Sequence, residues 1–242
     1  MANNMYNNSR ILALIPARGG SKGIKNKNII SLNGSPLISY TIQSSLKSKY
    51  IDDTVVTTDS QEIANISKKY GASVPFMRPA ELASDHAKTI DTVLHAIKVL
   101  DEMKNHFDIL VLLQPTQPLR TEIDIDQAIK RFFAKEMKGL VSISPVNEHP
   151  LLMRTMDEDG KVESLLGENS TCRRQDMRVY YKVNGCIYIN RISELTQNTS
   201  FNDNQVGYIM SEAHSVDIDD IKDLYLAEYY IQKEKIEKES YL

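Results

Sequence analysis

Cysteine is scarce in this 242-residue sequence, and its two cysteines, Cys172 and Cys186, form neither a C-x-x-C pair nor a disulfide framework. The five histidines lack the spacing of a metal-binding set, and the zinc-protease pattern His-Glu-x-x-His does not occur. These absences argue against a disulfide-stapled secreted fold and against a zinc site. They favour a protein that works in a reducing compartment.

Long apolar runs are also absent, because no stretch approaches the roughly 18 residues that a membrane-spanning helix needs. Residues 1–9 are polar and rich in asparagine, so we expect no signal peptide. Hydrophobic residues make up 41% and charged residues 25% of the chain, which is enough apolar material for a core and typical of a soluble domain. We therefore expect a cytoplasmic protein that does not bind membranes.

Acidic residues are missing from residues 1–51, which contain seven Lys or Arg side chains. The rest of the chain carries all 32 Asp and Glu residues against 22 Lys and Arg, within a net charge of −3. A basic end on an acidic protein favours a local anion-binding site over an extended nucleic-acid surface. We expect no nucleic-acid partner.

The first glycine-rich stretch forms neither of the two familiar nucleotide fingerprints. Gly19, Gly20 and Gly23 fit neither G-x-G-x-x-G nor G-x-x-x-x-G-K-[ST], which argues against a dinucleotide site and a P-loop. They follow the apolar run 11–15 and lie among basic residues. Such a loop can turn its N–H groups and its cations toward one anion, so we expect a nucleoside triphosphate there. The alternative is a solvated surface loop.

Strand-like and helix-like patterns alternate along most of the chain. This order predicts an α/β fold in which helices cover both faces of a mostly parallel sheet. We expect one domain over residues 1–242, with a β-rich arm inserted at about 145–182 that meets a second subunit; a mobile loop is the alternative. Strands are predicted at residues 11–15, 54–58, 73–77, 109–113, 140–144, 185–190 and 206–210, and helices at about 35–47, 60–69, 89–104, 122–135 and 219–238.

Two carboxylates close to each other near the C-terminus suggest a metal site. If Val216 and Ile218 point into the core from a strand, Asp217 and Asp219 emerge together on the opposite face. Two such carboxylates repel each other unless a cation lies between them, and hard oxygen ligands suit Mg²⁺ carried in with a nucleotide. The alternative is that Asp219 or Asp220 caps the following helix.

Two further groups are candidates for substrate contacts. Gln114 and Thr116 come directly after a buried strand, where an open α/β sheet places its ligand crevice; an ordinary proline turn is the alternative. Farther on, cationic groups beside aromatic rings suit a carboxylated sugar, although a solvated basic loop would have the same composition. These residues are Arg173, Arg174, Arg178 and Lys182, followed by Asn184, Tyr188 and Phe201.

Taken together, six segments resemble the N-acylneuraminate cytidylyltransferases, also called CMP-sialic acid synthetases. The resemblance runs in the same order over roughly residues 10–230. It implies a Rossmann-like nucleotidyltransferase fold with a mixed sheet, a homodimer, and a reaction that joins CTP to a nine-carbon acidic sugar with Mg²⁺ and releases pyrophosphate. The segments are Ile15–Asn28, Thr58–Ser60, Arg78–Ala83, Leu113–Arg120, Asn184–Tyr188 and Ser215–Asp219.

The resemblance also implies roles for single residues. Arg18, Ser21, Lys22 and Asn28 would hold the CTP phosphates and ribose, Arg78 would lie against the cytosine pocket, and Asp217 and Asp219 would bind the metal. Lys22 and Arg18 would stabilise the charge of the reacting phosphate. No His or Glu stands out as a general base, so we expect the metal to assist deprotonation. The sugar would be surrounded by Gln114, Arg174, Lys182, Asn184, Tyr188 and Phe201.

The chain departs from the family pattern in three places. Gln117 replaces a usual serine, Leu152 replaces a lysine that reaches into the neighbouring subunit, and Lys182-Val183 replaces Arg-Pro. Whether Arg154 takes over from the missing lysine stays open. The last two departures lie near the expected sugar pocket, so N-acetylneuraminic acid is the first candidate and legionaminic or pseudaminic acid the alternative. A non-catalytic, nucleotide-sensing relative is the alternative outside this reaction.

Overall fold

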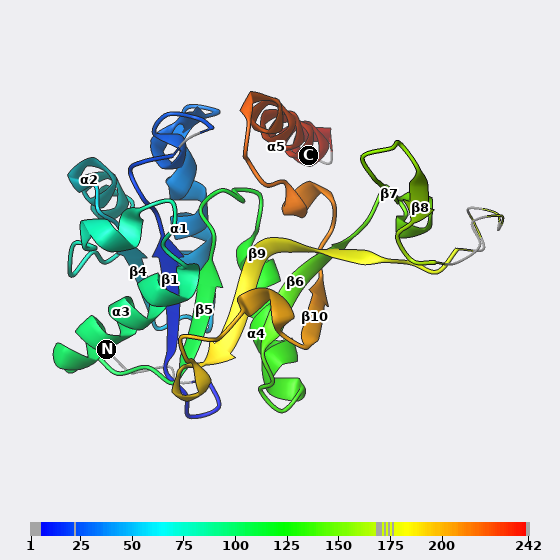
Figure 1. Cartoon of the computed structure of the whole chain (residues 1–242). Coiled ribbons are helices and arrows are strands. Elements are labelled where there is room, and N and C mark those ends of the chain that lie inside the picture. The colour runs from blue at the N-terminus through cyan, green and yellow to red at the C-terminus, as the bar shows by residue number, and fades with distance from the viewer. Residues whose placement is uncertain are drawn as a thin grey trace.

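The computed structural model describes residues 6–21, 23–167, 171, 173, 175 and 177–240 (Figure 1). Two of the predicted site residues, Lys22 and Arg174, lie outside these described residues. Within the described part of the chain, no helix combines the length and the apolar composition needed to cross a membrane.

A six-stranded sheet with the strand order β10-β6-β9-β5-β1-β4 forms the centre of the body. The strands β4, β1 and β5 run parallel, as do β6 and β10, whereas β9 is antiparallel to both of its neighbours. The predicted α/β fold with a mostly parallel, mixed sheet is therefore confirmed. The strands are β1 (Ile11–Pro16), β4 (Asp53–Thr57), β5 (Ile109–Leu113), β6 (Leu140–Pro145), β9 (Tyr181–Arg191) and β10 (Val206–Ile209).

The first strand shows how the helices are divided between the two faces of the sheet. Ile11, Ala13 and Ile15 pack in one core cluster with residues of α1 (Leu37–Lys47), α2 (Gln61–Lys69) and α4 (Glu122–Ala134). Leu12 and Leu14 pack in a second cluster with residues of α3 (Thr89–Glu102). Consecutive strand side chains point to opposite faces, so this alternation confirms that β1 is buried on both sides.

The last helix, α5 (Ile221–Ser240), packs outside these two layers (Figure 1). Its Leu224 and Ala227 lie in a third apolar cluster together with Val216 and Ile218. The helix begins two residues later than predicted, because the Asp220 carboxylate accepts hydrogen bonds from the N–H groups of Lys222 (2.7 Å) and Asp223 (3.2 Å). The capping role considered for Asp220 is thus confirmed.

Two predicted elements differ from the structure. Residues 73–77 do not form a strand: only Ser73 makes a bridge, to Val55 of β4, and Pro75 has no N–H group with which to continue a ladder. Helix α1 begins at Leu37 because residues 35–36 instead form β3 (Ser35–Pro36), which pairs with β2 (Ser31–Leu32). Between them lies an Asn-Gly turn in which both residues have positive φ, a common hairpin signal that the helix prediction overlooked.

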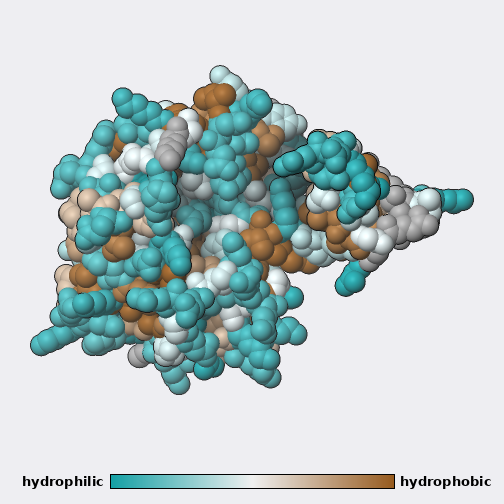
Figure 2. Space-filling model, in the orientation of Figure 1, coloured by the Kyte–Doolittle hydropathy of each residue, from teal (hydrophilic) through white to brown (hydrophobic). Residues whose placement is uncertain are grey.

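The predicted insertion forms an arm that extends away from the body (Figure 1). It contains the antiparallel pair β7 (Arg154–Met156) and β8 (Val162–Ser164), and it returns to the sheet through the first residues of β9. Many of its large apolar side chains are exposed, and Figure 2 shows hydrophobic atoms where the arm leaves the body. These side chains include Leu152, Met153, Met156, Val162, Leu165 and Val179.

Candidate functional site

The basic loop after β1 is held by its own polar side chains. The Ser21 hydroxyl donates to the carbonyl of Ile24 (2.6 Å) and accepts from the N–H of Lys27 (2.9 Å), so it fixes the turn. Asn28 donates from Nδ2 to the carbonyl of Arg18 (2.9 Å). Its other amide atom, Oδ1, is buried and has no hydrogen-bond partner among the described residues, which leaves an acceptor for a ligand.

A groove of about 460 Å³ opens beside this loop, at the carboxyl ends of β1 and β5. Segments from four parts of the chain line it, which is the place where open α/β sheets bind ligands. The structure thus brings together six of the residues predicted to contact substrate or metal. They are Arg18, Ser21, Asn28, Arg78, Gln114 and Asp219.

Three cations among the described residues line the groove, and each already has a partner. Arg18 Nη1 is 2.9 Å from Asp85 Oδ1, and Lys27 Nζ is 3.0 Å from Asp219 Oδ1. The Lys27 side chain is largely buried, and the family resemblance implied no role for it. An incoming phosphate would have to compete with Asp85 for Arg18, whereas Lys27 links the first loop to the acidic segment.

Arg78 is the third cation, and it serves as a wall of the groove. Its buried guanidinium donates to the Thr57 carbonyl from Nη2 and to Thr57 Oγ1 (3.3 Å) from Nε. Burial and, to a smaller extent, the charge of Arg18 lower the pKa of Arg78 to about 10, while Asp59 acts in the opposite direction. The side chain stays charged at neutral pH, and its Nη1 donates to the Leu82 carbonyl (3.5 Å), so it connects the end of β4 to the segment after Pro79.

The acidic segment, residues 215–219, lies against the basic loop, since Asp219 pairs with Lys27. Val216 and Ile218 are buried as predicted, but residues 216–218 form no strand; the Ile218 N–H donates to the Thr116 carbonyl (2.9 Å). Asp219 lines the groove, whereas Asp217 lines another cavity. Burial, together with the charge of Asp219, raises the pKa of Asp217. Hydrogen bonds with Thr116 and Gln117 and the charge of Lys27 act in the opposite direction.

Whether the acidic segment could bind a metal ion depends on the oxygen ligands that its side chains offer. Among the residues that the structure describes, no group of three or more His, Cys, Asp or Glu side chains could hold an ion alone. Asp217 and Asp219 therefore offer two hard oxygen donors and would need further oxygen ligands from a bound phosphate. Mg²⁺ is commonly bound in this way, through one or two carboxylates together with substrate phosphates.

Gly23 sits where the basic loop approaches this segment. A Cβ atom on Gly23 would lie 2.8 Å from the main-chain carbonyl oxygen of Asp219, so the two segments could not keep their spacing. We expect Gly23→Ala to weaken CTP binding roughly tenfold, because the loop and Asp219 would be pushed apart. Calorimetric titration with CTP measures this. Gly20→Ala is the matched control, since nothing lies within 4 Å of its Cβ position; equal affinities of the two variants would contradict the expectation.

A second cavity of about 440 Å³ adjoins the groove and shares Thr89 and Gln114 with it. It brings together three of the predicted sugar-contacting residues, Gln114, Tyr188 and Phe201. The Tyr188 and Phe201 rings lie 5.8 Å apart, and the Tyr188 hydroxyl donates to Asn202 Oδ1 (2.8 Å). Burial raises the pKa of Tyr188 to about 12, so its hydroxyl stays neutral.

Lys182 and Asn184 are not part of this second cavity. They line the third cavity, of about 280 Å³, together with Asp217. The Asn184 amide accepts from Ser142 Oγ (2.5 Å) and the Cys186 N–H (3.1 Å) and donates to Ser215 Oγ (3.0 Å). This departs from the predicted grouping, because a register shift between β6 and β9 and a left-handed Gly185 turn Asn184 inward.

The other residues at which the chain departs from the family pattern lie outside the first two cavities. Gln117 is buried and donates from Nε2 to the Asn184 carbonyl, so it supports β9. Leu152 is exposed on the arm. Arg154 Nη1 donates to the carbonyls of Leu151 and Met153, both at 2.8 Å, which are in its own turn. These contacts do not place Arg154 in any of the three cavities.

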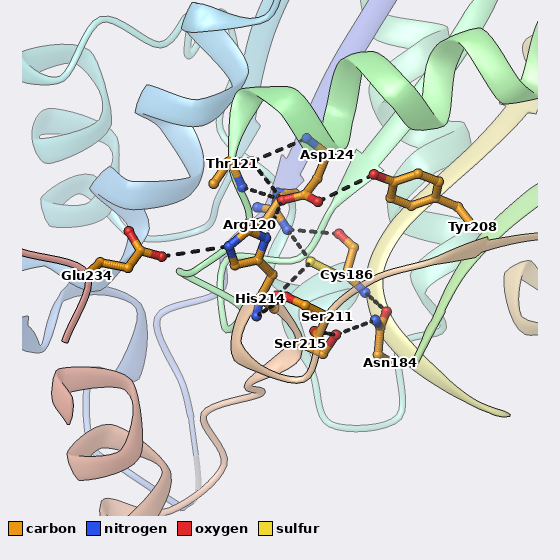
Figure 3. A network of polar contacts seen from close by, with 10 residues as sticks. All are labelled: Arg120, Thr121, Asp124, Asn184, Cys186, Tyr208, Ser211, His214, Ser215 and Glu234. Atoms are coloured by element: carbon orange, nitrogen blue, oxygen red, sulfur yellow. Dashed lines mark hydrogen bonds and ion pairs between the residues drawn. The ribbon is translucent and has the colours of Figure 1, made fainter. Parts of the chain in front are cut away.

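A polar network that the sequence analysis missed supports the acidic segment (Figure 3). Arg120 is buried and donates to the Cys186 carbonyl (2.8 Å) and to Thr41 Oγ1 (2.8 Å). Burial raises the pKa of the Cys186 thiol to about 11, so it is neutral. Nearby, His214 Nδ1 lies 2.9 Å from the Oδ2 atom of Asp124, which forms a capping box with Thr121 at the start of α4.

The pair of His214 and Asp124 makes stability depend on pH. Its hydrogen bond raises the pKa of His214 against the effect of burial, and the same bond lowers the pKa of Asp124. Protonated His214 therefore stabilises the fold below the ordinary histidine pKa of about 6.5, and this contribution is lost as pH rises through the raised value. The carboxylate contribution exists above the ordinary Asp pKa of about 4 and is lost as pH falls through the lowered value.

We expect His214→Gln to destabilise the protein by roughly 1–2 kcal/mol at pH 5.5 and by less at pH 8.5, because only the protonated ring forms the ion pair. Urea unfolding at the two pH values measures the difference. His106→Gln is a suitable control, since the pair of His106 and Asp101 is largely exposed. A difference that grows toward pH 8.5 would contradict the assignment.

Comparisons with known proteins agree with one another. A model of the cytidylyltransferase family matches residues 12–236. The CMP-N,N'-diacetyllegionaminic acid synthase of Legionella pneumophila is 38% identical over 228 residues, which cover 90% of this chain and 95% of that protein. The N-acylneuraminate cytidylyltransferase of Escherichia coli is 34% identical over 232 residues, or 95% of this chain and 54% of that longer protein.

Among solved structures, the chain is similar to CMP:2-keto-3-deoxy-manno-octonic acid synthetase complexed with CTP. The TM-score is 0.69 at 17% sequence identity, and the match covers 93% of this chain and 100% of that one. At this identity the likeness concerns the fold alone.

Proposed function

Because the chain belongs to the cytidylyltransferase family, we propose that it transfers the CMP part of CTP to a nonulosonic acid, a nine-carbon acidic sugar, and releases pyrophosphate. The resemblance to the N-acylneuraminate cytidylyltransferases that the motifs implied is confirmed by the family match. The observation that supports the reaction is the pair of adjoining cavities, of about 460 and 440 Å³, which share Gln114. Two substrates held on either side of one side chain can react directly.

CTP is assigned to the first groove. Its cationic lining and the free Asn28 Oδ1 acceptor suit phosphates and a ribose hydroxyl. Lys22, outside the described residues, remains a predicted phosphate ligand. Arg18 and Lys27 would stabilise the negative charge that develops on the phosphate oxygens.

The sugar is assigned to the second cavity. There the Tyr188 and Phe201 rings offer an apolar wall, and Gln114 can orient the sugar against the nucleotide. In the reaction, the C2 hydroxyl oxygen forms a bond to the α-phosphorus of CTP. The bond between the α-phosphorus and the bridging oxygen breaks, pyrophosphate leaves with the electron pair, and the hydroxyl proton is released.

Asp217 and Asp219 would hold Mg²⁺. Burial is the main cause of the raised pKa of Asp217, and the charge of Asp219 adds to it, so a cation between the two carboxylates would relieve their repulsion. When bound, the ion would neutralise phosphate charge and make the attacking hydroxyl more acidic. The chain's own contribution is to hold Asp219 in the lining of the groove and Asp217 two residues before it, through the burial of Val216 and Ile218.

For the sugar itself, N-acetylneuraminic acid is the first candidate, from the motifs. N,N'-diacetyllegionaminic acid is the second, because the synthase for that sugar matches this chain over 95% of its own length at 38% identity. Leu152 stands where the family pattern has a lysine, and Lys182-Val183 stands where it has Arg-Pro. Both differences are further reasons to test N,N'-diacetyllegionaminic acid.

A homodimer formed through the arm is also proposed. Met156 and Val162, which are cross-strand neighbours in the pair β7 and β8, and the nearby Leu165 are exposed, and a partner subunit would remove these apolar side chains from water. Sedimentation at micromolar concentration tests this; a monomer throughout would contradict it.

The reaction is tested by incubating the purified full chain with CTP and Mg²⁺. Pyrophosphate release is then measured with N-acetylneuraminic acid, with a legionaminic acid and with a pseudaminic acid. We expect release only when a nonulosonic acid is present, and a CMP-sugar in the mass spectrum. CTP binding without release on any sugar would favour a nucleotide-sensing protein instead. Near wild-type turnover of Lys22→Ala would contradict the role predicted for that residue.

A further inference from the structure

The second cavity contains a single charged side chain among the described residues that line it. Its other lining residues are apolar, aromatic, amide-bearing or hydroxyl-bearing, and the exception is Lys88. Lys88 lies directly before α3 and is exposed, and no carboxylate in the described part of the chain forms an ion pair with it. The cavity is therefore cationic as well as polar.

The main chain of Lys88 is held by hydrogen bonds, although no described carboxylate pairs with its side chain. Its carbonyl accepts hydrogen bonds from the N–H groups of Asp91 (3.1 Å) and Thr92 (3.4 Å), the first turn of α3. Two residues later, Ile90 is buried in the core. A flexible ammonium group on a rigid base can follow an anion within the cavity, as lysine commonly does.

The neutral residues of the cavity cannot replace this charge. The amides and hydroxyls of residues 197–202 suit the hydroxyl and acyl groups of a sugar. A carboxylate that leaves water needs a cation or several strong donors in compensation. The cations of the first groove do not line this cavity, Lys182 lines another one, and Arg174 lies outside the described residues.

We propose that Lys88 binds the carboxylate of the acidic sugar and thereby selects acidic over neutral sugars. This proposal rests on the proposed function, since it assumes that the second cavity receives the sugar. Lys88 is a binding residue in it and takes no part in the bond changes. Because Lys88 does not line the first groove, we expect that CTP binding does not depend on it.

The test compares Lys88→Gln and Lys88→Arg with the wild type at saturating CTP. We expect Lys88→Gln to raise the KM for the sugar about tenfold, with kcat and the KM for CTP changed less than twofold, because one charge-assisted contact is lost. Lys88→Arg should restore most of the loss. Lys98→Gln is the matched control, because Lys98 is a 76% exposed lysine of the same helix that pairs with Glu102.

A second readout does not depend on turnover. Calorimetry with the sugar acid and with its carboxamide, in the presence of a non-hydrolysable CTP analogue, should show a preference for the acid in the wild type that Lys88→Gln loses. An unchanged sugar KM, or a rise in the KM for CTP alone, would overturn the proposal while the wild-type reaction still stands. A wild type that binds CTP but neither binds nor converts any acidic sugar would overturn the proposed function, and this proposal with it.

Discussion

Asp217→Asn is expected to lower the rate of pyrophosphate release about 100-fold while CTP still binds in the absence of divalent cations. Asparagine has the shape of aspartate and can still accept the contact from Thr116, so the loss would come from the charge. Within the described residues no group of three or more His, Cys, Asp or Glu side chains could hold an ion, so the proposed metal would depend on Asp217 and Asp219. The measurement is kcat over a Mg²⁺ titration, where a higher Mg²⁺ requirement should accompany the lower rate.

The neighbouring Asp220 provides the control. Its carboxylate caps α5 through the N–H groups of Lys222 and Asp223, and asparagine is an equally good capping residue. Asp220→Asn therefore removes the same charge close by and should leave kcat within about twofold. If both variants lose activity equally, the effect would be one of net charge or of helix capping, and the metal role of Asp217 would be contradicted.

The parts of the fold that the sequence predicted well are those in which local pattern and tertiary burial agree. The run 11–15 became β1 because every residue in it is buried on one face or the other. Val216 and Ile218 were placed correctly even without a strand, since an extended segment alternates its side chains whether or not it joins a sheet. Residues 73–77 failed because apolar content suggested a strand that Pro75 cannot complete.

The predicted site was recovered where short motifs follow strands, and it was incomplete where distant segments meet. Arg18, Asn28 and Gln114 converge because the strands before them are neighbours in the sheet. Lys88 is an ordinary lysine in the sequence, and its proposed role follows only from the structure, in which the start of α3 lies beside residues 197–202. Asn184 was grouped with the sugar residues by its motif, but a register shift at β9 turned it toward Ser142.

Arg120 is a second residue whose importance depends on distant contacts, and we expect its removal to have the largest effect on stability. It is only 2% exposed, and it joins α1 to β9 through Thr41 and Cys186. Arg120→Ala would remove the donor to the Cys186 carbonyl and to Thr41 Oγ1 and would leave a cavity between α1 and β9. We expect a loss of about 3 kcal/mol, because buried groups lose their hydrogen bonds to a charged donor and a large side chain is truncated inside the protein.

For a chain of this length, that loss corresponds to a fall in Tm of about 6–12 °C, which calorimetry or circular dichroism can measure. Arg120→Met fills most of the space without the hydrogen bonds, so it separates packing from polar contacts and should lie between Arg120→Ala and the wild type. Arg191→Ala is the control, because Arg191 forms a partly exposed pair with Glu194 at 3.7 Å, and such pairs contribute under about 1 kcal/mol. If Arg120→Ala unfolds at the same temperature as this control, the network does not hold β9 against α1. The groove would then owe its shape to the apolar layers alone.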